Sequence, residues 1–185
     1  MFVAIELAPT LLESLERAIA PLREASPDLA WTGTRQRHVT MKFLGSVEAD
    51  RAERLAPMMD EVARAHRPFA IHISGVGAFP SFRKARVVWL GVGPERRFEL
   101  LQHDLELGAE GVGFEIEGRA FRPHVTLARI AAVLDVEHMR TFARAARKVD
   151  FTASVTVAEM TLFESTLAPS GARYRRIHAA TLGGR

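Results

Sequence analysis

Two short runs of the sequence carry the same chemically useful pattern. Residues 38–41 read His-Val-Thr-Met, and residues 124–127 read His-Val-Thr-Leu. With seven histidines and eleven threonines in 185 residues, fewer than one His-x-Thr triplet is expected by chance. Both copies also have valine in the middle and a large apolar residue after the threonine. The matched pair therefore indicates one function shared by two parts of the fold.

Strand geometry predicts where these side chains point. Residues i and i+2 of a strand share one face, whereas residues i+1 and i+3 occupy the other. His38 and Thr40 should therefore face the same side, with their apolar neighbours in the core, and His124 and Thr126 repeat the arrangement. Two such strands facing a cleft would offer two imidazoles and two hydroxyls to one small ligand.

These groups suit chemistry at a phosphodiester. In-line displacement at phosphorus needs a base on the attacking oxygen and an acid on the leaving oxygen, and histidine, with a pKa near neutrality, can serve as either. Threonine hydroxyls can donate to the non-bridging oxygens, where negative charge builds up in the transition state. A five-membered cyclic phosphate needs no metal, because ring strain already lowers its barrier. The residues alone leave open which histidine is the acid.

Other catalytic classes lack their residues. Threonine is not a usual metal ligand, and neither a His-x-x-x-His spacing nor a carboxylate completes a metal site around the pair. The sequence has no Gly-x-Ser-x-Gly elbow, no P-loop and no Gly-x-Gly-x-x-Gly fingerprint. Cysteine is absent, which excludes a disulfide scaffold, a thiol nucleophile and a Cys-ligated zinc. We therefore expect neither a metal nor a cofactor.

Composition sets further bounds. The chain is 48% hydrophobic and 25% charged, ordinary values for one globular domain, which exclude a disordered or fibrous protein. No apolar run approaches the roughly 20 residues of a membrane helix, and the N-terminus has no basic region typical of a signal peptide. The net charge of +3 is too small to establish a nucleic-acid partner. We expect a cytoplasmic monomer without membrane contact.

The elements that must position the two motifs occur in a repeated order. Strands are predicted at 2–7, 37–44, 69–77, 85–91, 123–130, 151–157, 159–164 and 174–181, with a turn at 169–171 between the last two. Helices are predicted from Pro9-Thr10 to about residue 22, and at 48–66, 98–111 and 135–148. Thr10 is the expected N-cap of the first helix, with Glu13 completing a capping box, and Pro21 should kink or end it.

Helix, strand, helix and strands thus occur twice, which suggests an internal duplication. The order predicts an α+β fold with two pseudo-symmetric lobes, each an antiparallel sheet with helices on its outer face. The active-site cleft would lie between the lobes. We expect one domain, residues 1–185, whose two lobes carry the motifs at 38–41 and 124–127.

The surroundings of the motifs resemble a known family. The matching pieces are Phe-Val-Ala-Ile-Glu-Leu at 2–7, His-Val-Thr-Met-Lys-Phe-Leu-Gly at 38–45, Gly-Ala-Phe-Pro at 77–80, Phe-Arg-Pro-His-Val-Thr-Leu-Ala-Arg at 121–129 and Gly-Ala-Arg-Tyr at 171–174. Over essentially the whole chain they resemble the bacterial and archaeal RNA 2′,3′-cyclic phosphodiesterases. This family, also called 2′-5′ RNA ligase, is part of the two-histidine (2H) phosphoesterase superfamily.

The resemblance implies metal-independent hydrolysis of RNA 2′,3′-cyclic phosphate ends to 2′-phosphates, with reversible 2′-5′ RNA ligation as a second activity. It makes His38 the proton donor to the departing 3′ oxygen and His124 the proton acceptor that activates water, while Thr40 and Thr126 hold the phosphate. The implied partner is RNA with a 2′,3′-cyclic phosphate end, tRNA fragments included. Two alternatives stay open: a 2H enzyme acting on a small cyclic nucleotide or ADP-ribose cyclic phosphate, and a non-catalytic module that binds RNA ends.

Five further residues are candidates for substrate binding. The family pattern favours Arg129 on phosphate and Phe43 near a base, although strict alternation turns both away from the cleft unless the strands bend or end there. Lys42 continues the face of the first motif, where it would either add positive charge or form a solvated strand end. Arg122 would face the cleft or be solvated, and Tyr174 would stack on a base.

Overall fold

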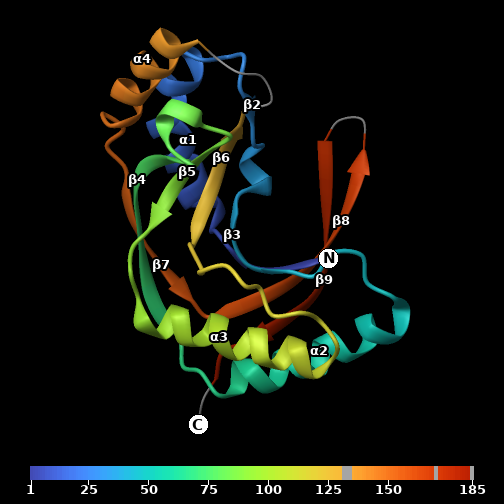
Figure 1. Cartoon of the computed structure of the whole chain (residues 1–185). Helices are drawn as coiled ribbons and strands as arrows, with labels where there is room; N and C mark the ends of the chain where they lie inside the picture. Colours follow the sequence, from blue (N-terminus) through green and yellow to red (C-terminus); the bar gives the residue numbers. More distant parts are fainter. Residues whose placement is uncertain (131–134, 169–170, 184–185) are drawn as a thin grey trace.

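One antiparallel sheet of nine strands runs through the computed structural model, which describes residues 1–130, 135–168 and 171–183 (Figure 1). The strand order is β7-β4-β5-β6-β3-β1-β8-β9, and β2 pairs with β6 beside this path. The strands are β1 (Phe2–Glu6), β2 (Ala30–Trp31), β3 (His38–Phe43), β4 (Phe69–Phe79), β5 (Val87–Val92), β6 (His124–Arg129), β7 (Thr152–Val157), β8 (Glu159–Ala168) and β9 (Gly171–Thr181).

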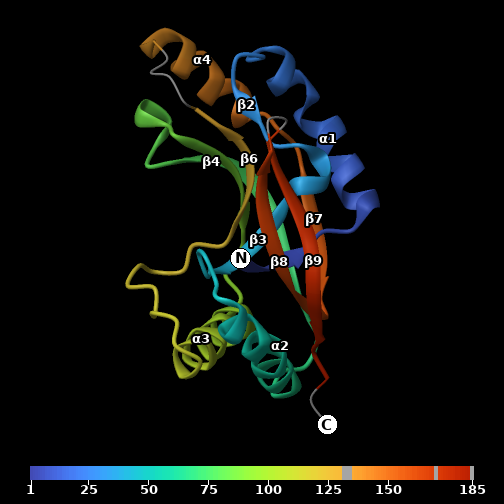
Figure 2. The same cartoon turned by 90° about the vertical axis from the view of Figure 1, so that its right-hand side faces the viewer.

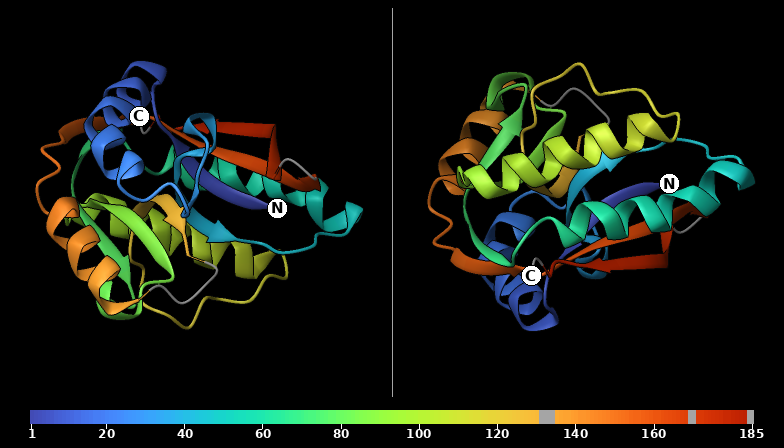
Figure 3. Two further views of the ribbon diagram at one scale, coloured as in Figure 1. Left: turned by 90° about the horizontal axis from the view of Figure 1, so that it is seen from above. Right: turned by 90° about the horizontal axis from the view of Figure 1, so that it is seen from below.

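Two pairs of helices pack at opposite ends of the molecule (Figures 1 and 2). One pair is α1 (Pro9–Glu24) with α4 (Val136–Ala146), and the other is α2 (Ala49–Arg64) with α3 (Arg96–Gly111). From below, α2 and α3 lie side by side (Figure 3). Short 3₁₀ helices, η1 (Thr34–Gln36) and η2 (Phe82–Lys84), precede β3 and β5. No helix in the described ranges has both the length and the apolar character that crossing a membrane requires.

The sheet divides into two halves of four strands, β6-β5-β4-β7 and β3-β1-β8-β9. The halves meet where β3 pairs with β6 through Val39 and Val125. Both valines are fully buried, as are the apolar stripes of the helices that pack against the sheet. Each motif strand therefore lies at the inner edge of its own half, and the predicted α+β architecture with two pseudo-symmetric lobes is confirmed.

The N-cap expected for the first helix is wrong, and Pro21 does not end the helix. Ala8, not Thr10, is the N-cap of α1, and no side chain caps it. Pro9 occupies the first turn, where its missing N–H costs no helical hydrogen bond. The helix also continues past Pro21 to Glu24. Leu22 is only 2% exposed, so burial of the last turn outweighs the hydrogen bond that the proline removes.

The last hairpin is longer than predicted. Strand β8 extends to Ala168 and β9 begins at Gly171, so their pairing continues well past the predicted ends. Of the predicted turn, residues 169 and 170 lie outside the described residues. The extension matters for the site because its Ser165 pairs with Tyr174, and the hairpin projects beside η1 and β3 (Figures 1 and 2).

Candidate active site

Each motif histidine is oriented by the carbonyl two residues before it. The Nδ1 atom of His38 lies 2.8 Å from the carbonyl oxygen of Gln36, and Nδ1 of His124 lies 2.8 Å from the carbonyl oxygen of Arg122. A carbonyl only accepts hydrogen bonds, so both Nδ1 atoms must donate. The Nε2 atoms are then the ones that gain and lose a proton. Both imidazoles are therefore held in one tautomer, ready to act through Nε2.

The antiparallel register brings the two motifs together. Because Val39 pairs with Val125, His38 is level with Thr126 and Thr40 is level with His124. All four polar side chains are half-buried and lie on the face opposite the two buried valines. Each histidine thus stands beside the threonine of the other strand. The structure places two acid–base groups and two hydroxyls at the central seam of the sheet.

His38 has the more enclosed environment of the two histidines. Its ring stacks on Phe2 with a centroid distance of 4.8 Å, and Tyr174 approaches it edge-on at 5.5 Å. Its Nε2 atom lies 3.1 Å from the hydroxyl oxygen of Thr40. Burial lowers the pKa of His38 below its ordinary value, and the positive charge of His124 lowers it further, against the opposing effects of the Gln36 carbonyl and Glu6. His38 is therefore neutral at pH 7 in the free protein.

A β-bulge follows the threonine in each motif. In β3, Thr40 pairs with Ala4 and Lys42 pairs with Val3, so Met41 is the extra residue. In β6 the register against β5 shifts at the corresponding place, and Leu127 is the extra residue. A bulge changes which face the following side chains occupy. In both motif strands the third residue after the histidine is therefore the extra one, and from the fourth residue onward the side chains face the side opposite to the one that strict alternation predicts.

The bulges turn Phe43 and Arg129 back toward the cleft. Phe43 pairs with Phe2, whose face of β1 also pairs with His38 and Thr40. The register of β6 against β5 likewise puts Arg129 on the face of the second motif. Phe43 is 65% exposed, and Arg129 is exposed as well. Both candidates thus lie on the same face as the motif histidines, where strict alternation would not have placed them.

Lys42 is buried, because the same bulge turns it toward the opposite face. It is 2% exposed, so the alternative of a solvated strand end is wrong. Its ammonium group forms an ion pair with Glu106 of α3 and donates to the carbonyl oxygen of Glu115 at 2.9 Å. The carboxylate compensates for the cost of burying the charge. Lys42 thus ties β3 to α3, and it also lines the larger of two hollows beside His124.

Two adjoining hollows open beside His124. One has a volume of about 350 Å³ and the other about 300 Å³, and both are lined by His124, Phe79 and Arg122. The larger one also reaches Thr40 and Phe43. Arg122 thus lies at the cleft, as one of its two predicted alternatives required. The larger hollow thus reaches from the second histidine to Phe43 of the first lobe.

Several contacts of the site were not predicted from the sequence. Phe2 stacks on His38, Phe79 lies edge-on to His124 at 5.1 Å, and Trp89 lines the smaller hollow. Phe2 and Phe79 belong to the matching pieces at 2–7 and 77–80. The resemblance to the family could therefore have identified these two residues as candidates. Their positions beside the histidines follow only from the strand register. Throughout the described ranges, no cluster of three or more His, Asp or Glu side chains is arranged to hold a metal ion.

Comparison with known proteins places the chain in a family. A family model described as the 2′-5′ RNA ligase superfamily matches residues 11–168. The chain belongs to this superfamily. It is 31% identical over 173 residues to an RNA 2′,3′-cyclic phosphodiesterase of Methanothermobacter thermautotrophicus, covering 94% of this chain and 93% of that protein. The Aeropyrum pernix protein of the same name is 33% identical over 146 residues, 76% of this chain and 79% of its own length.

Solved structures of other proteins have the same fold. A Thermus thermophilus protein superposes with a TM-score of 0.83 at 26% identity, covering 100% of this chain and 98% of that one. Escherichia coli LigT in complex with 3′-AMP superposes with a TM-score of 0.76 at 27% identity, covering 98% and 96% of the two chains. The two-lobed arrangement described above is therefore shared with these solved structures.

The lowered pKa of His38 predicts a pH-dependent contribution to stability. The unfolded chain protonates this residue near its ordinary pKa of about 6.5, whereas the folded protein resists protonation until a lower pH. The unfolded state therefore binds more protons, and the free energy of unfolding falls as the pH drops below about 6.5. The melting temperature of the wild type should fall more between pH 7 and pH 5 than that of His38→Gln. Equal falls would contradict the inferred shift.

Proposed function

We propose that this protein is a metal-independent hydrolase of RNA 2′,3′-cyclic phosphate ends that produces 2′-phosphomonoesters. The observation that carries the proposal is the matched pair of Nδ1–carbonyl hydrogen bonds, which leaves both Nε2 atoms to exchange protons at the central seam. One can accept a proton while the other donates one. The names of the relatives, RNA 2′,3′-cyclic phosphodiesterases, support the same reaction.

In the proposed reaction, water attacks phosphorus as His124 Nε2 takes its proton. The bond between phosphorus and the 3′ oxygen breaks, and His38 Nε2 gives its proton to that oxygen. The products are a 3′-hydroxyl and a 2′-phosphate, and proton exchange with solvent restores both histidines. This assignment of roles follows the family resemblance, because the two Nε2 atoms have equivalent backbone supports. Since burial lowers the pKa of His38, the negative charge of the bound phosphate must favour its protonated form.

The surrounding residues have matching roles in this proposal. Thr40 and Thr126 donate to the non-bridging oxygens, and Arg129 supplies the nearby positive charge. The terminal nucleoside occupies the hollow of about 350 Å³, where Phe43 is its stacking surface and Arg122 contacts a backbone phosphate. Tyr174 packs against His38, so it both restrains the imidazole ring and stacks on a nucleotide base. One chain supplies every group, so we expect a monomer to be active.

Ligation follows from the same geometry in the proposal. If the 5′-hydroxyl of a second RNA takes the place of water, His124 removes its proton and His38 again protonates the departing 3′ oxygen. The product is a 2′-5′ phosphodiester. Because the same acid–base pair must serve both directions, the reaction is reversible at one site. Joining requires the second RNA to reach the side of the phosphate opposite His38.

The test is end-group analysis of an oligoribonucleotide with a 2′,3′-cyclic phosphate, incubated with and without EDTA. We expect a 2′-phosphate product and the same rate in both samples. A 3′-phosphate product would contradict the assigned leaving group, and loss of turnover with EDTA would contradict a metal-independent mechanism. Faster turnover of a cyclic mononucleotide than of the oligonucleotide would favour the small-nucleotide alternative. Tight binding without turnover would leave only the RNA-end-binding module.

A further inference from the structure

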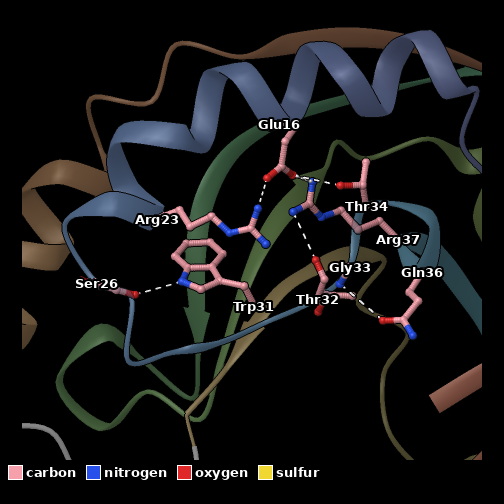
Figure 4. A network of polar contacts seen from close by, with 9 residues as sticks. All are labelled: Glu16, Arg23, Ser26, Trp31, Thr32, Gly33, Thr34, Gln36 and Arg37. Atoms are coloured by element: carbon pink, nitrogen blue, oxygen red, sulfur yellow. Dashed lines mark hydrogen bonds and ion pairs between the residues drawn. The ribbon is translucent and has the colours of Figure 1, made fainter. Parts of the chain in front are cut away.

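A buried arginine lies immediately before the first motif histidine. The side chain of Arg37 has no exposed surface, and its Nη1 atom lies 2.6 Å from a carboxylate oxygen of Glu16 on α1 (Figure 4). Its Nη2 atom donates to the carbonyl oxygen of Thr32 at 3.3 Å. The arginine therefore ties the segment before β3 both to α1 and to the chain that leaves β2.

The same carboxylate organises the whole turn. Glu16 also forms an ion pair with Arg23 and accepts a hydrogen bond from the hydroxyl of Thr34 at 3.3 Å (Figure 4). Thr34 begins η1, and Arg37 follows its last residue. The two contacts therefore fasten both ends of η1 to one point on α1.

Gln36 fastens the turn from the other side. Its side-chain oxygen accepts a hydrogen bond from the backbone N–H of Gly33 at 3.3 Å, and its amide group donates to the carbonyl oxygen of Ala172 in β9. The peptide between Gln36 and Arg37 is thus held through both of its flanking side chains. The carbonyl of this peptide is the group that accepts the hydrogen bond from Nδ1 of His38.

Stability alone does not account for a charged residue at position 37. Burial lowers the pKa of Arg37, which reflects the cost of desolvating the guanidinium. Its Nε and Nη1 atoms are buried, and neither has a hydrogen-bond partner within the described part of the chain, so Nη1 meets Glu16 as an ion pair only. Replacing a buried ion pair by apolar side chains of similar volume is often neutral or stabilising. A guanidinium buried at this cost suggests that it is needed to fix the position of the backbone beside it.

The second lobe restrains the equivalent carbonyl without a charge. The carbonyl of Arg122 accepts from Nδ1 of His124, and the next residue is Pro123, whose ring fixes its own φ angle. Proline also restricts the residue before it to extended conformations. The residue before His38 is an arginine instead, so the restraint there comes from Glu16. The two lobes reach the same geometry by different means.

We propose that Arg37 is a positioning residue for His38. By its ion pair with Glu16 it fixes the carbonyl of Gln36, which keeps the proton of neutral His38 on Nδ1 and turns Nε2 toward the cleft. The consequence for the rate rests on the proposed function, whereas the consequence for the tautomer does not. The two can therefore be measured separately.

The tautomer is measured by ¹⁵N NMR of the imidazoles in the full chain at about pH 8, where histidines are neutral. His38→Gln identifies the signals of His38. In the wild type we expect His38 to carry its proton on Nδ1. In Arg37→Met the signals should move toward a mixture of the two tautomers, while those of His124 stay unchanged. Arg23→Met is the matched control, because it removes another arginine from the same carboxylate and leaves residues 34–37 untouched.

The kinetic measurement uses the cyclic-phosphate oligonucleotide. Arg37→Met should lower kcat roughly 10- to 100-fold, the scale of a misplaced catalytic group, with little change in KM. Arg37→Lys keeps an ion pair with Glu16 and should recover most of the loss. Glu16→Ala removes the carboxylate that Arg37 contacts. Because the side chain of Glu16 is half-exposed, this variant tests the same inference if Arg37→Met does not fold.

The outcomes separate the positioning role from the activity. If the His38 signals stay as in the wild type in folded Arg37→Met, or in Glu16→Ala when Arg37→Met does not fold, the positioning role is overturned, whatever the enzyme hydrolyses. A tautomer change equally large in Arg23→Met would also overturn it, because the effect would then belong to Glu16 in general. If the tautomer moves as expected but the wild type shows no turnover, the proposed function fails and the positioning role stands.

Discussion

Replacing either His38 or His124 with alanine is expected to lower kcat by roughly 10²- to 10⁴-fold, the usual contribution of a positioned general acid or base. Each imidazole presents Nε2 at the seam, so each variant removes one of the two proton-transfer groups. The double variant should be far less impaired than the product of the two single effects, because both groups act in one step. Steady-state kinetics on the cyclic-phosphate oligonucleotide measure all three.

The matched control is His103→Ala, which removes an exposed histidine from α3. It should keep the wild-type rate. Circular dichroism and melting temperature establish that each variant is folded, which matters for His38 because its ring packs against Phe2 and Tyr174. A folded single variant with nearly full activity would contradict the two-histidine mechanism.

The positions of the main helices and strands could be predicted from the sequence, because the spacing of apolar residues shows which side of each element is buried. The motif strands were expected at 37–44 and 123–130 and occur at His38–Phe43 and His124–Arg129. The repetition of His-x-Thr at the same place in each half predicted that both motif strands would face one cleft, because local alternation and an internal repeat can be read from a sequence. The direct pairing of the two strands through Val39 and Val125 was not predicted.

The faces of Phe43, Arg129 and Lys42 could not be predicted, because they depend on a bulge in each strand. A bulge is set by pairing with a neighbouring strand, here β1 for one motif and β5 for the other. Strict alternation places Lys42 on the catalytic face and Phe43 off it, the reverse of what is found. The ion-pair partner of Lys42 lies 64 residues away on α3, which no local pattern indicates.

The restraints on the histidines were also invisible in the sequence. The acceptors of both Nδ1 atoms are backbone carbonyls, and every residue type provides a carbonyl. The residues that restrain those carbonyls are visible in the sequence, since an arginine precedes one histidine and a proline precedes the other. That the arginine is buried is known only from the structure. The role of the arginine can be inferred only from its contact with Glu16, because charged residues before a strand are ordinarily solvated.

Replacing Thr40 or Thr126 with valine is expected to lower kcat by roughly 10²- to 10³-fold, the loss measured when one donor to a developing oxyanion is removed. Valine keeps the branched shape that suits a strand, so the change removes the hydroxyl and little else. Serine at either position keeps the hydroxyl and should recover most of the rate. Thr152→Val, on an exposed position of β7, is the matched control and should behave as the wild type.

The split between kcat and KM tells what the hydroxyls do. If the hydroxyls bound the phosphate equally well in the substrate and in the transition state, their removal would raise KM and leave kcat unchanged. That result would contradict the proposed role. The two variants should also differ from each other. The hydroxyl of Thr40 lies 3.1 Å from Nε2 of His38, so Thr40→Val should shift the pH profile of kcat/KM as well as lower it. Thr126→Val should lower the profile without moving it, and identical shifts in both variants would mean that the contact in β3 does not tune His38.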